Sequence, residues 1–138
     1  MIIQNGDSAP EKNTQGVLSA EDMQNICRKV VGIMEAEKLF MKPDFSAWEL
    51  SRAAGVNTKN ISKSINGYMS MNFYELLTRM RLEEAKRLMR HEVKMNIEEV
   101  AHKSGFRSRT TFYTRFVQHE KMTPKKYMNL FMKSKTNL

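Results

Sequence analysis

Residues 101–116 read AHKSGFRSRTTFYTRF. The stretch carries two helical patterns separated by a break at Gly105, and the second pattern restarts at Ser108. Phe112 and Phe116 are four residues apart, so they share one face of a helix, whereas Arg, Thr and Tyr crowd the opposite face. The pattern predicts a helix that packs its apolar face onto a domain. The polar face is either ordinary solvated surface or a surface that contacts an acidic partner.

The composition limits the classes to which this chain can belong. Its 138 residues suffice for one domain or two small ones. The single cysteine, Cys27, excludes an intrachain disulfide framework and a four-cysteine zinc site. The first sixteen residues lack the apolar stretch of a signal peptide, and no apolar run is long enough to span a membrane. We therefore expect a soluble cytoplasmic protein with no membrane partner.

The formal net charge of +8 is unevenly distributed. Residues 1–44 carry a net charge of −2, and residues 45–138 carry +10. A basic surface over two thirds of the chain favours an anionic partner, of which nucleic acid is the first candidate.

Helix starts follow a repeated capping pattern. A polar N-cap residue is followed three positions later by a carboxylate that can bond back to it, with apolar residues on either side. Full boxes are Ser46 with Glu49, Asn72 with Glu75 and Asn96 with Glu99; Ser19 with Asp22 is looser, and Thr123 with Pro124 keeps only the cap. These signals predict an all-α fold with helices at about 20–39, 47–54, 58–66, 73–90, 97–103, 109–119 and 124–132. Residues 1–17 are unpatterned and are predicted to be a disordered tail.

The sequence also repeats itself. ELSRAAGVNTKNISKSI, from Glu49, aligns with EVAHKSGFRSRTTFYTRF, from Glu99, and Gly55 matches Gly105. Each copy reads as a short helix, a turn at glycine and a second helix, which is the helix-turn-helix arrangement. The helix predicted between them, 73–90, would be roughly 27 Å long. This length is comparable to the spacing of about 34 Å between major-groove segments on one side of B-DNA.

The second copy resembles a known signature. GFRSRTTFYTRFVQHEKMTPKKYM is similar to the AraC-type DNA-binding domain, whose pattern is G-F-x-[S/D]-x-x-x-F-x-x-x-F followed by T-P-x-x-Y. The first half, LSRAAGVNTKNISKSIN followed by MNFYELLTRMRLEEAKRLM, also fits, and the resemblance covers about residues 19–132. It implies two helix-turn-helix subdomains joined by a long helix, which bind duplex DNA to regulate transcription. The implied division is 18–70, a linker helix at 71–92, 93–133 and a frayed C-terminus at 134–138.

The resemblance also implies which residues contact DNA. The reading helices would be Thr58–Asn66 and Arg109–Gln118. Positions that match base-contacting residues are Lys59, Ser62 and Lys63 in the first copy, and Arg109, Thr110, Tyr113 and Thr114 in the second. Thr58, Asn60, Arg107 and Ser108 complete the predicted set. Arg and Lys suit guanine, Asn suits adenine, and Thr or Tyr reaches a phosphate or a thymine methyl group. Arg107 precedes the cap and is expected to meet phosphate.

The chain departs from the family pattern at four positions. Ser70 and Lys121 stand where glycine is usual, so these turns need either positive φ or a different geometry. A cation usual at Thr114 is moved one residue on, to Arg115. Trp48 replaces a polar residue and is expected to pack half-buried, with a phosphate contact as the alternative.

Other functions find less support in the sequence. His91, His102 and His119 have no metal-ligand spacing, and no catalytic triad or phosphate loop is present, so we expect neither a cofactor, a metal nor an enzyme. The expected partners are double-stranded DNA and, as a candidate, RNA polymerase. Two reading units in one chain predict that a monomer suffices, and the chain leaves no room for a small-molecule effector domain. The alternatives are a protein-interaction adaptor and a non-specific nucleic-acid binder that keep the fold.

Overall fold

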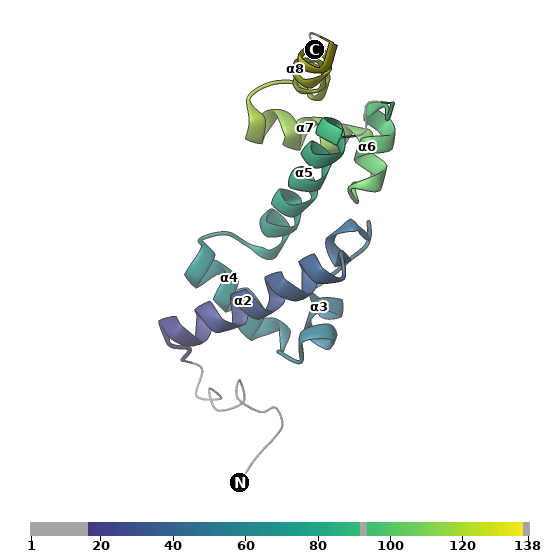
Figure 1. The fold of residues 1–138 in the computed structure, drawn as a ribbon. Coiled ribbons are helices and arrows are strands. Elements are labelled where there is room, and N and C mark those ends of the chain that lie inside the picture. The colour runs from purple at the N-terminus through teal and green to yellow at the C-terminus, as the bar shows by residue number, and fades with distance from the viewer. Residues whose placement is uncertain (1–16, 92–93, 137–138) are drawn as a thin grey trace. The chain divides into compact units, whose positions relative to one another are not determined.

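The computed structural model describes residues 17–91 and 94–136, so that all but the last residue of the predicted tail lies outside it. Within these ranges the chain forms seven α-helices, one short 3-10 helix and no strand (Figure 1). The helices are α2 (Ala20–Ala36), η1 (Leu39–Met41), α3 (Ala47–Ala54), α4 (Thr58–Met69), α5 (Phe73–His91), α6 (Ile97–Lys103), α7 (Arg109–Glu120) and α8 (Pro124–Thr136). The all-α prediction is confirmed.

Three predicted helix ends differ from the observed ones by three or four residues, and the ends of α5 and α7 differ by one. Helix α2 stops at Ala36 rather than at residue 39, because Lys38 adopts a left-handed φ of 53° and η1 follows. Helix α4 continues to Met69, beyond the predicted end at residue 66. Helix α8 continues to Thr136, beyond the predicted end at residue 132, and residues 137–138 lie outside the description.

The predicted capping boxes form hydrogen bonds. The amide of Glu49 donates to Ser46 Oγ at 3.2 Å, and the amide of Ser46 donates to Glu49 Oε1 at 3.3 Å. Asn96 and Glu99 make the same reciprocal pair at 2.8 and 2.9 Å. The looser box at Ser19 is also complete. Because each box satisfies backbone donors at a helix start, the helix starts could be predicted from sequence alone.

The chain forms two compact units, and the first contains residues 17–39 and 45–76. In this unit α2 packs against α3 and α4, and α3 packs against α4. A left-handed Gly55, with φ of 71°, closes α3 and lets the chain turn into α4. The apolar residues buried in this unit are Ile26, Cys27, Val30, Met34, Phe45, Leu50, Ala54, Val56, Ile61, Ile65, Phe73 and Leu76.

The second unit contains residues 40–44, 77–91 and 94–136. It buries Leu82, Ala85, Leu88, Met89, Val100, Ala101, Phe106, Phe112 and Phe116 in one cluster. Phe106, Phe112, Phe116 and Tyr127 form a series of ring contacts, with centroids 5.2, 5.6 and 5.5 Å apart. Because Phe112 and Phe116 are fully buried, the apolar stripe of α7 holds this helix on its unit, as the sequence predicts.

Ser70 and Lys121 adopt the left-handed conformation that glycine would favour. Their φ values are 58° and 62°, and each residue caps the C-terminus of a helix, α4 and α7 respectively. The turn geometry expected of the family is therefore kept without glycine, at the steric cost of a Cβ in the left-handed region.

Candidate nucleic-acid interface

Helix α4 presents a basic polar face in the first unit. Asn57 caps the helix, and its Oδ1 accepts a hydrogen bond from the Asn60 amide at 2.7 Å. Ile61 and Ile65 are fully buried, which fixes the rotation of the helix on its unit. The exposed residues of the first two turns are Thr58, Lys59, Ser62 and Lys63, all of them predicted contact residues.

Asn60 does not lie on this exposed face. It is only 9% exposed and is buried together with Ser64 on the packed side of α4. Asn60, a predicted DNA contact, is therefore not part of the exposed face formed by the other predicted residues of α4. Asn60 and Ser64 are four residues apart, so they lie on the same face of the helix, and both are buried there. The polarity of Asn60 in the sequence gave no sign of this.

Helix α7 presents the corresponding face in the second unit. Ser108 caps it, and Ser108 Oγ accepts from the Thr111 amide at 3.1 Å while donating to Thr111 Oγ1 at 3.0 Å. The predicted contact residues Arg109, Thr110, Tyr113 and Thr114 are all exposed, as is Arg115. The cation one residue beyond Thr114 is therefore accessible, although it lies about 100° further round the helix.

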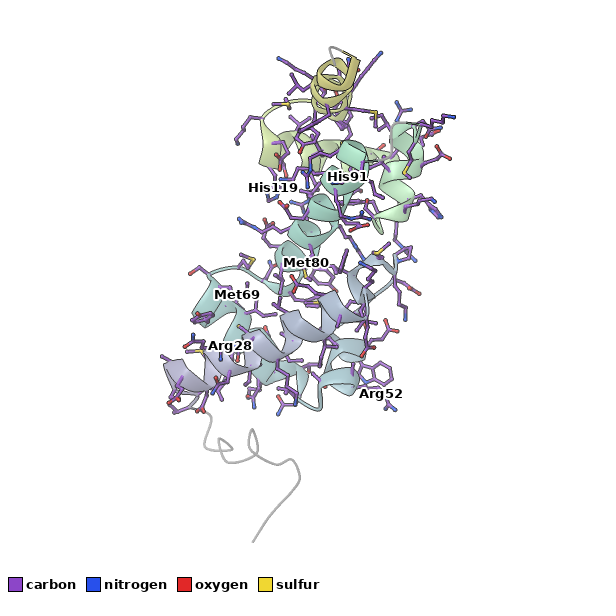
Figure 2. All side chains as sticks on the ribbon, in the orientation of Figure 1. Arg28, Arg52, Met69, Met80, His91 and His119 are labelled. Carbon is purple, nitrogen blue, oxygen red and sulfur yellow. The ribbon has the colours of Figure 1, made fainter. Side chains whose placement is uncertain are left out.

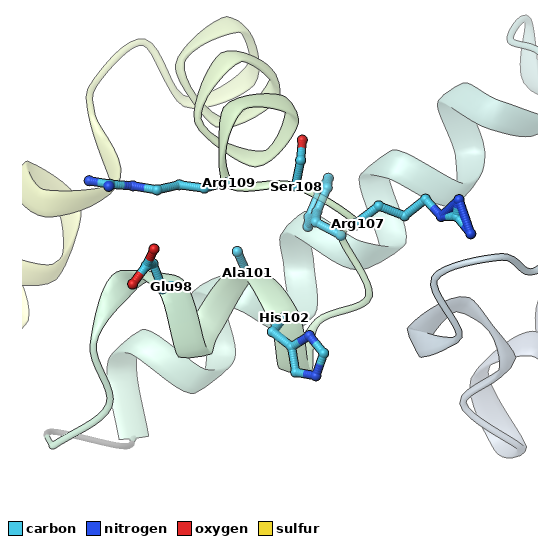
Figure 3. Close-up of a pocket in the computed structure, with 7 residues that line it drawn as sticks. Glu98, Ala101, His102, Arg107, Ser108 and Arg109 are labelled. Atoms are coloured by element: carbon cyan, nitrogen blue, oxygen red, sulfur yellow. The ribbon is translucent and has the colours of Figure 1, made fainter.

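An open depression of about 140 Å³ lies at the turn from α6 into α7. It brings together three predicted contact residues, Arg107, Ser108 and Arg109, together with Glu98 and His102. Figure 3 shows the side chains of Arg107 and Arg109 pointing to opposite sides of Ser108, with the Glu98 carboxylate on the Arg109 side. The backbone amides at the start of α7 add a partial positive charge, so the site suits an anionic oxygen.

The sequence did not single out Arg81, which lies on α5 in the same unit. Its Nε donates to the Phe40 carbonyl at 2.7 Å, and its Nη2 donates to the Lys42 carbonyl, also at 2.7 Å. Burial lowers the pKa of Arg81, and the neighbouring charge of Arg107 lowers it further. The surrounding stretch, RMRLEEAKR, is rich in charged residues of both signs, so no pattern distinguished this arginine from exposed ones.

Ion pairs connect α5 to the end of α7. Lys86 Nζ lies 2.8 Å from Glu83 and 3.0 Å from Glu120, which is the last residue of α7. Burial lowers the pKa of Lys86, but hydrogen bonds and opposite charges from the two glutamates outweigh burial and raise the pKa overall. Because Lys86 is mostly buried, this pair fixes the far end of the helix whose start carries Arg109.

Trp48 differs from its prediction. It is 62% exposed rather than half-buried, and the Arg52 guanidinium lies 5.0 Å from the centre of its ring. Figure 2 shows Arg52 projecting outward from α3. The two residues are four apart on α3, so an amphipathic ring and a cation share one accessible face.

Cys27 and the histidines form no metal site in the part of the chain that the structure describes, since no three metal-ligating side chains cluster there. The Cys27 thiol is buried and donates to the Ser64 carbonyl at 3.2 Å, and burial raises its pKa. Over the same residues, no helix is both long and apolar enough to cross a bilayer.

The fold is shared with solved structures of low sequence identity. A transcriptional regulator from Chromobacterium violaceum, of the AraC-type DNA-binding domain-containing proteins, is 20% identical, with a TM-score of 0.68 over 77% of this chain and 91% of that chain. A DNA-binding transcriptional dual regulator from Escherichia coli K-12 is 18% identical, with a TM-score of 0.68 over 78% of this chain and 93% of that one. The DNA-binding domain of the global transcriptional factor AdpA, solved with a target DNA, is 19% identical, with a TM-score of 0.66 over 75% and 90% of the two chains.

Sequence comparison identifies the family. No curated protein sequence matches the chain significantly. A family described as a helix-turn-helix domain, however, matches residues 50–129, more than half of the length. The match includes both capped helices with basic exposed faces, α4 and α7. The chain belongs to the AraC-type helix-turn-helix family, whose members are DNA-binding transcription regulators rather than enzymes.

Proposed function

We propose that this protein is a sequence-specific transcription regulator that reads two major-groove segments of duplex DNA, one with α4 and one with α7. The observation that carries the proposal is the matched design of these helices. Each begins at a polar cap, buries an apolar stripe and leaves lysine, arginine, serine or threonine exposed on the opposite side. A helix held in this way can enter the major groove while its apolar side stays packed on the rest of its unit.

The exposed side chains divide by chemistry. Lys59, Lys63 and Arg109 carry the donors that suit guanine O6 and N7, and they are the proposed base readers. Arg107 and Ser108 lie at the amino end of α7, where phosphate binding is favoured. The remaining proposed contacts, to phosphate or to thymine methyl groups, are Thr58, Ser62, Thr110, Tyr113 and Thr114.

A single chain is proposed to suffice for binding. It carries two reading helices in two compact units, whereas a protein with one helix-turn-helix needs a dimer to cover two half-sites. The 19 residues of α5 give a helix of roughly 28 Å between the two helix-turn-helix motifs along the chain. The net charge of +8 adds an attraction to DNA that is independent of sequence and weakens with salt.

Selection of duplexes from a random pool at physiological salt tests this proposal. Enrichment of a site with two short boxes about one helical turn apart is the expected result. The Lys63→Ala variant should relax the sequence preference at one box, and Arg109→Ala at the other. If wild-type protein binds duplexes but enriches no sequence, the proposed sequence reading is wrong.

A protein-interaction adaptor is the second candidate, and the exposed Trp48–Arg52 pair favours it. Tryptophan and arginine are the residues most enriched at binding hot spots between proteins. A DNA-reading regulator could also use this pair to contact RNA polymerase. A protein that acts only as an adaptor, however, would enrich no DNA sequence in the selection experiment. The selection experiment therefore separates the two candidates.

A further inference from the structure

A short segment between two helices of the first unit belongs to the second unit. Residues Phe40–Asp44 join α2 to α3, yet they belong to the same compact unit as residues 77–91 and 94–136. Arg81 of α5 accounts for much of this attachment, because its guanidinium donates to three carbonyl groups of the segment. The distances are 2.7 Å to Phe40, 2.7 Å to Lys42 and 3.5 Å to Pro43. The first two are charge-assisted bonds of good length, and the third is marginal.

The same segment touches the turn that leads into α7. Gly105 has a φ of 108°, and a Cβ at this position would lie 2.7 Å from the Phe40 carbonyl oxygen and 3.0 Å from Met41 Cα. It would also lie 2.9 Å from Arg81 Nε. Glycine is therefore required here both by conformation and by close approach of backbone. The turn rests directly on the segment and on the guanidinium that holds it.

The Gly105 turn determines where α7, the second proposed reading helix, begins. Gly105 lies two residues before Arg107 and three before the cap residue Ser108. Phe106 between them is buried in the core of the unit, so a shift of the turn would be transmitted to α7. The positive charge of Arg107 lowers the pKa of Arg81, so the two guanidinium groups are close enough to interact electrostatically.

We propose that Arg81 is a positioning residue for DNA reading by α7: it fixes Phe40–Asp44 beneath the Gly105 turn and so aligns Arg107 and Arg109. This inference rests on the proposed function of α7. It adds that a residue outside both helix-turn-helix motifs, with no DNA contact of its own, determines how well one of the two boxes is discriminated.

The test compares Arg81→Met with Arg79→Met in the full chain. Both substitutions remove one positive charge from α5, and Arg79 is exposed. The effects of Arg109→Ala and Lys63→Ala on the selected site first show which box is read by α7 and which by α4. Affinities of each variant are then measured for three duplexes: the selected one, one with a changed α7 box and one with a changed α4 box. Arg81→Met should reduce discrimination at the α7 box by about tenfold and leave discrimination at the α4 box unchanged, whereas Arg79→Met should preserve both.

Two outcomes of the binding measurements would overturn the proposal. One is unchanged discrimination at both boxes in Arg81→Met, and the other is an equal loss at both, which would indicate a general loss of structure. Arg81→Lys adds a second comparison, since lysine keeps the charge but cannot donate from a planar fork to two carbonyl groups. Full recovery of discrimination by lysine would show that charge alone matters and that the hydrogen-bond geometry does not.

Hydrogen exchange of the free protein separates this proposal from the proposed function. Amides from Gly105 to Arg109 should exchange at least tenfold faster in Arg81→Met, while amides of α8 keep their wild-type rates. If wild-type protein enriches no DNA sequence, the proposed function fails, and these exchange rates still decide whether Arg81 positions the turn. Unchanged exchange at the turn would overturn the positioning role whatever the DNA result.

Discussion

Replacing Lys121 by glycine should stabilise this protein, although it removes a side chain. Lys121 closes α7 with φ of 62° and ψ of 25°, and its amide donates to the Val117 carbonyl at 2.9 Å. The left-handed conformation costs a residue with a Cβ roughly 1–2 kcal/mol. Glycine avoids this cost but loses about 0.4–1 kcal/mol through the greater entropy of the unfolded chain. The middle values of these two ranges differ by about 0.8 kcal/mol, which is the predicted gain for Lys121→Gly.

Urea unfolding followed by far-UV circular dichroism measures this gain. Ser70→Gly is the parallel variant in the first unit, because Ser70 has φ of 58° and caps α4 in the same way. Lys29→Gly is the matched control, since Lys29 is exposed in the interior of α2 with helical geometry. The control should lose about 1 kcal/mol, the ordinary cost of glycine inside a helix. If Lys121→Gly and Ser70→Gly lose as much as the control, the left-handed caps are not strained and the reasoning is refuted.

Other variants probe the core, the interface and the thiol. Gly105→Ala should destabilise the protein by at least about 2 kcal/mol in the same unfolding assay, because its Cβ would meet the Phe40 carbonyl and its φ is positive. Lys63→Ala and Arg109→Ala should each weaken binding to the selected duplex by about 1–3 kcal/mol in a titration at fixed salt, and wild-type affinity for both variants would contradict the assignment of base readers. Cys27 should resist a thiol reagent in the folded protein, because burial raises its pKa and leaves little thiolate; its labelling rate should rise only when urea unfolds the chain.

The features that could be predicted from the sequence are those set by neighbours along the chain. Capping boxes such as Ser46 with Glu49 need only four consecutive residues, so the predicted starts of α3 and α6 coincide with the observed ones. The stripe of Phe112 and Phe116 likewise depends only on helical spacing. The resemblance to a family then assigned roles to the exposed residues, which the fold alone does not do.

The features that could not be predicted depend on residues far apart in the sequence. The bond from Arg81 to the Phe40 carbonyl joins positions 41 residues apart, and nothing near either residue indicates it. The exposure of Trp48 likewise depends on the tertiary packing around α3, which the local sequence does not reveal. A large aromatic side chain is usually expected to be at least partly buried. Lys38 ends α2 without a glycine or proline to mark the site.

Helices α4 and α7, the two proposed reading helices, expose different side chains, and this difference bears on the DNA sequences that we expect them to select. The internal repeat pairs Ile61 with Phe112, and both are fully buried, so each helix packs on its own unit through this position. On this alignment the exposed Lys63 matches the exposed Thr114. The cation of α7 next to Thr114 is Arg115, which is exposed, whereas its counterpart in α4 is the buried Ser64.

Cations and hydroxyls therefore occupy different positions on the exposed faces of α4 and α7. Direct readout depends on which donor or acceptor reaches which base edge, so two helices that expose different side chains select different sequences. We expect the two boxes of the selected site to differ from each other, in contrast to the repeated half-sites read by a symmetric dimer. Selection of two identical boxes would mean that the exposed residues of α4 and α7 contribute little to specificity. The sequence preference of the protein would then have to come from DNA shape or deformability.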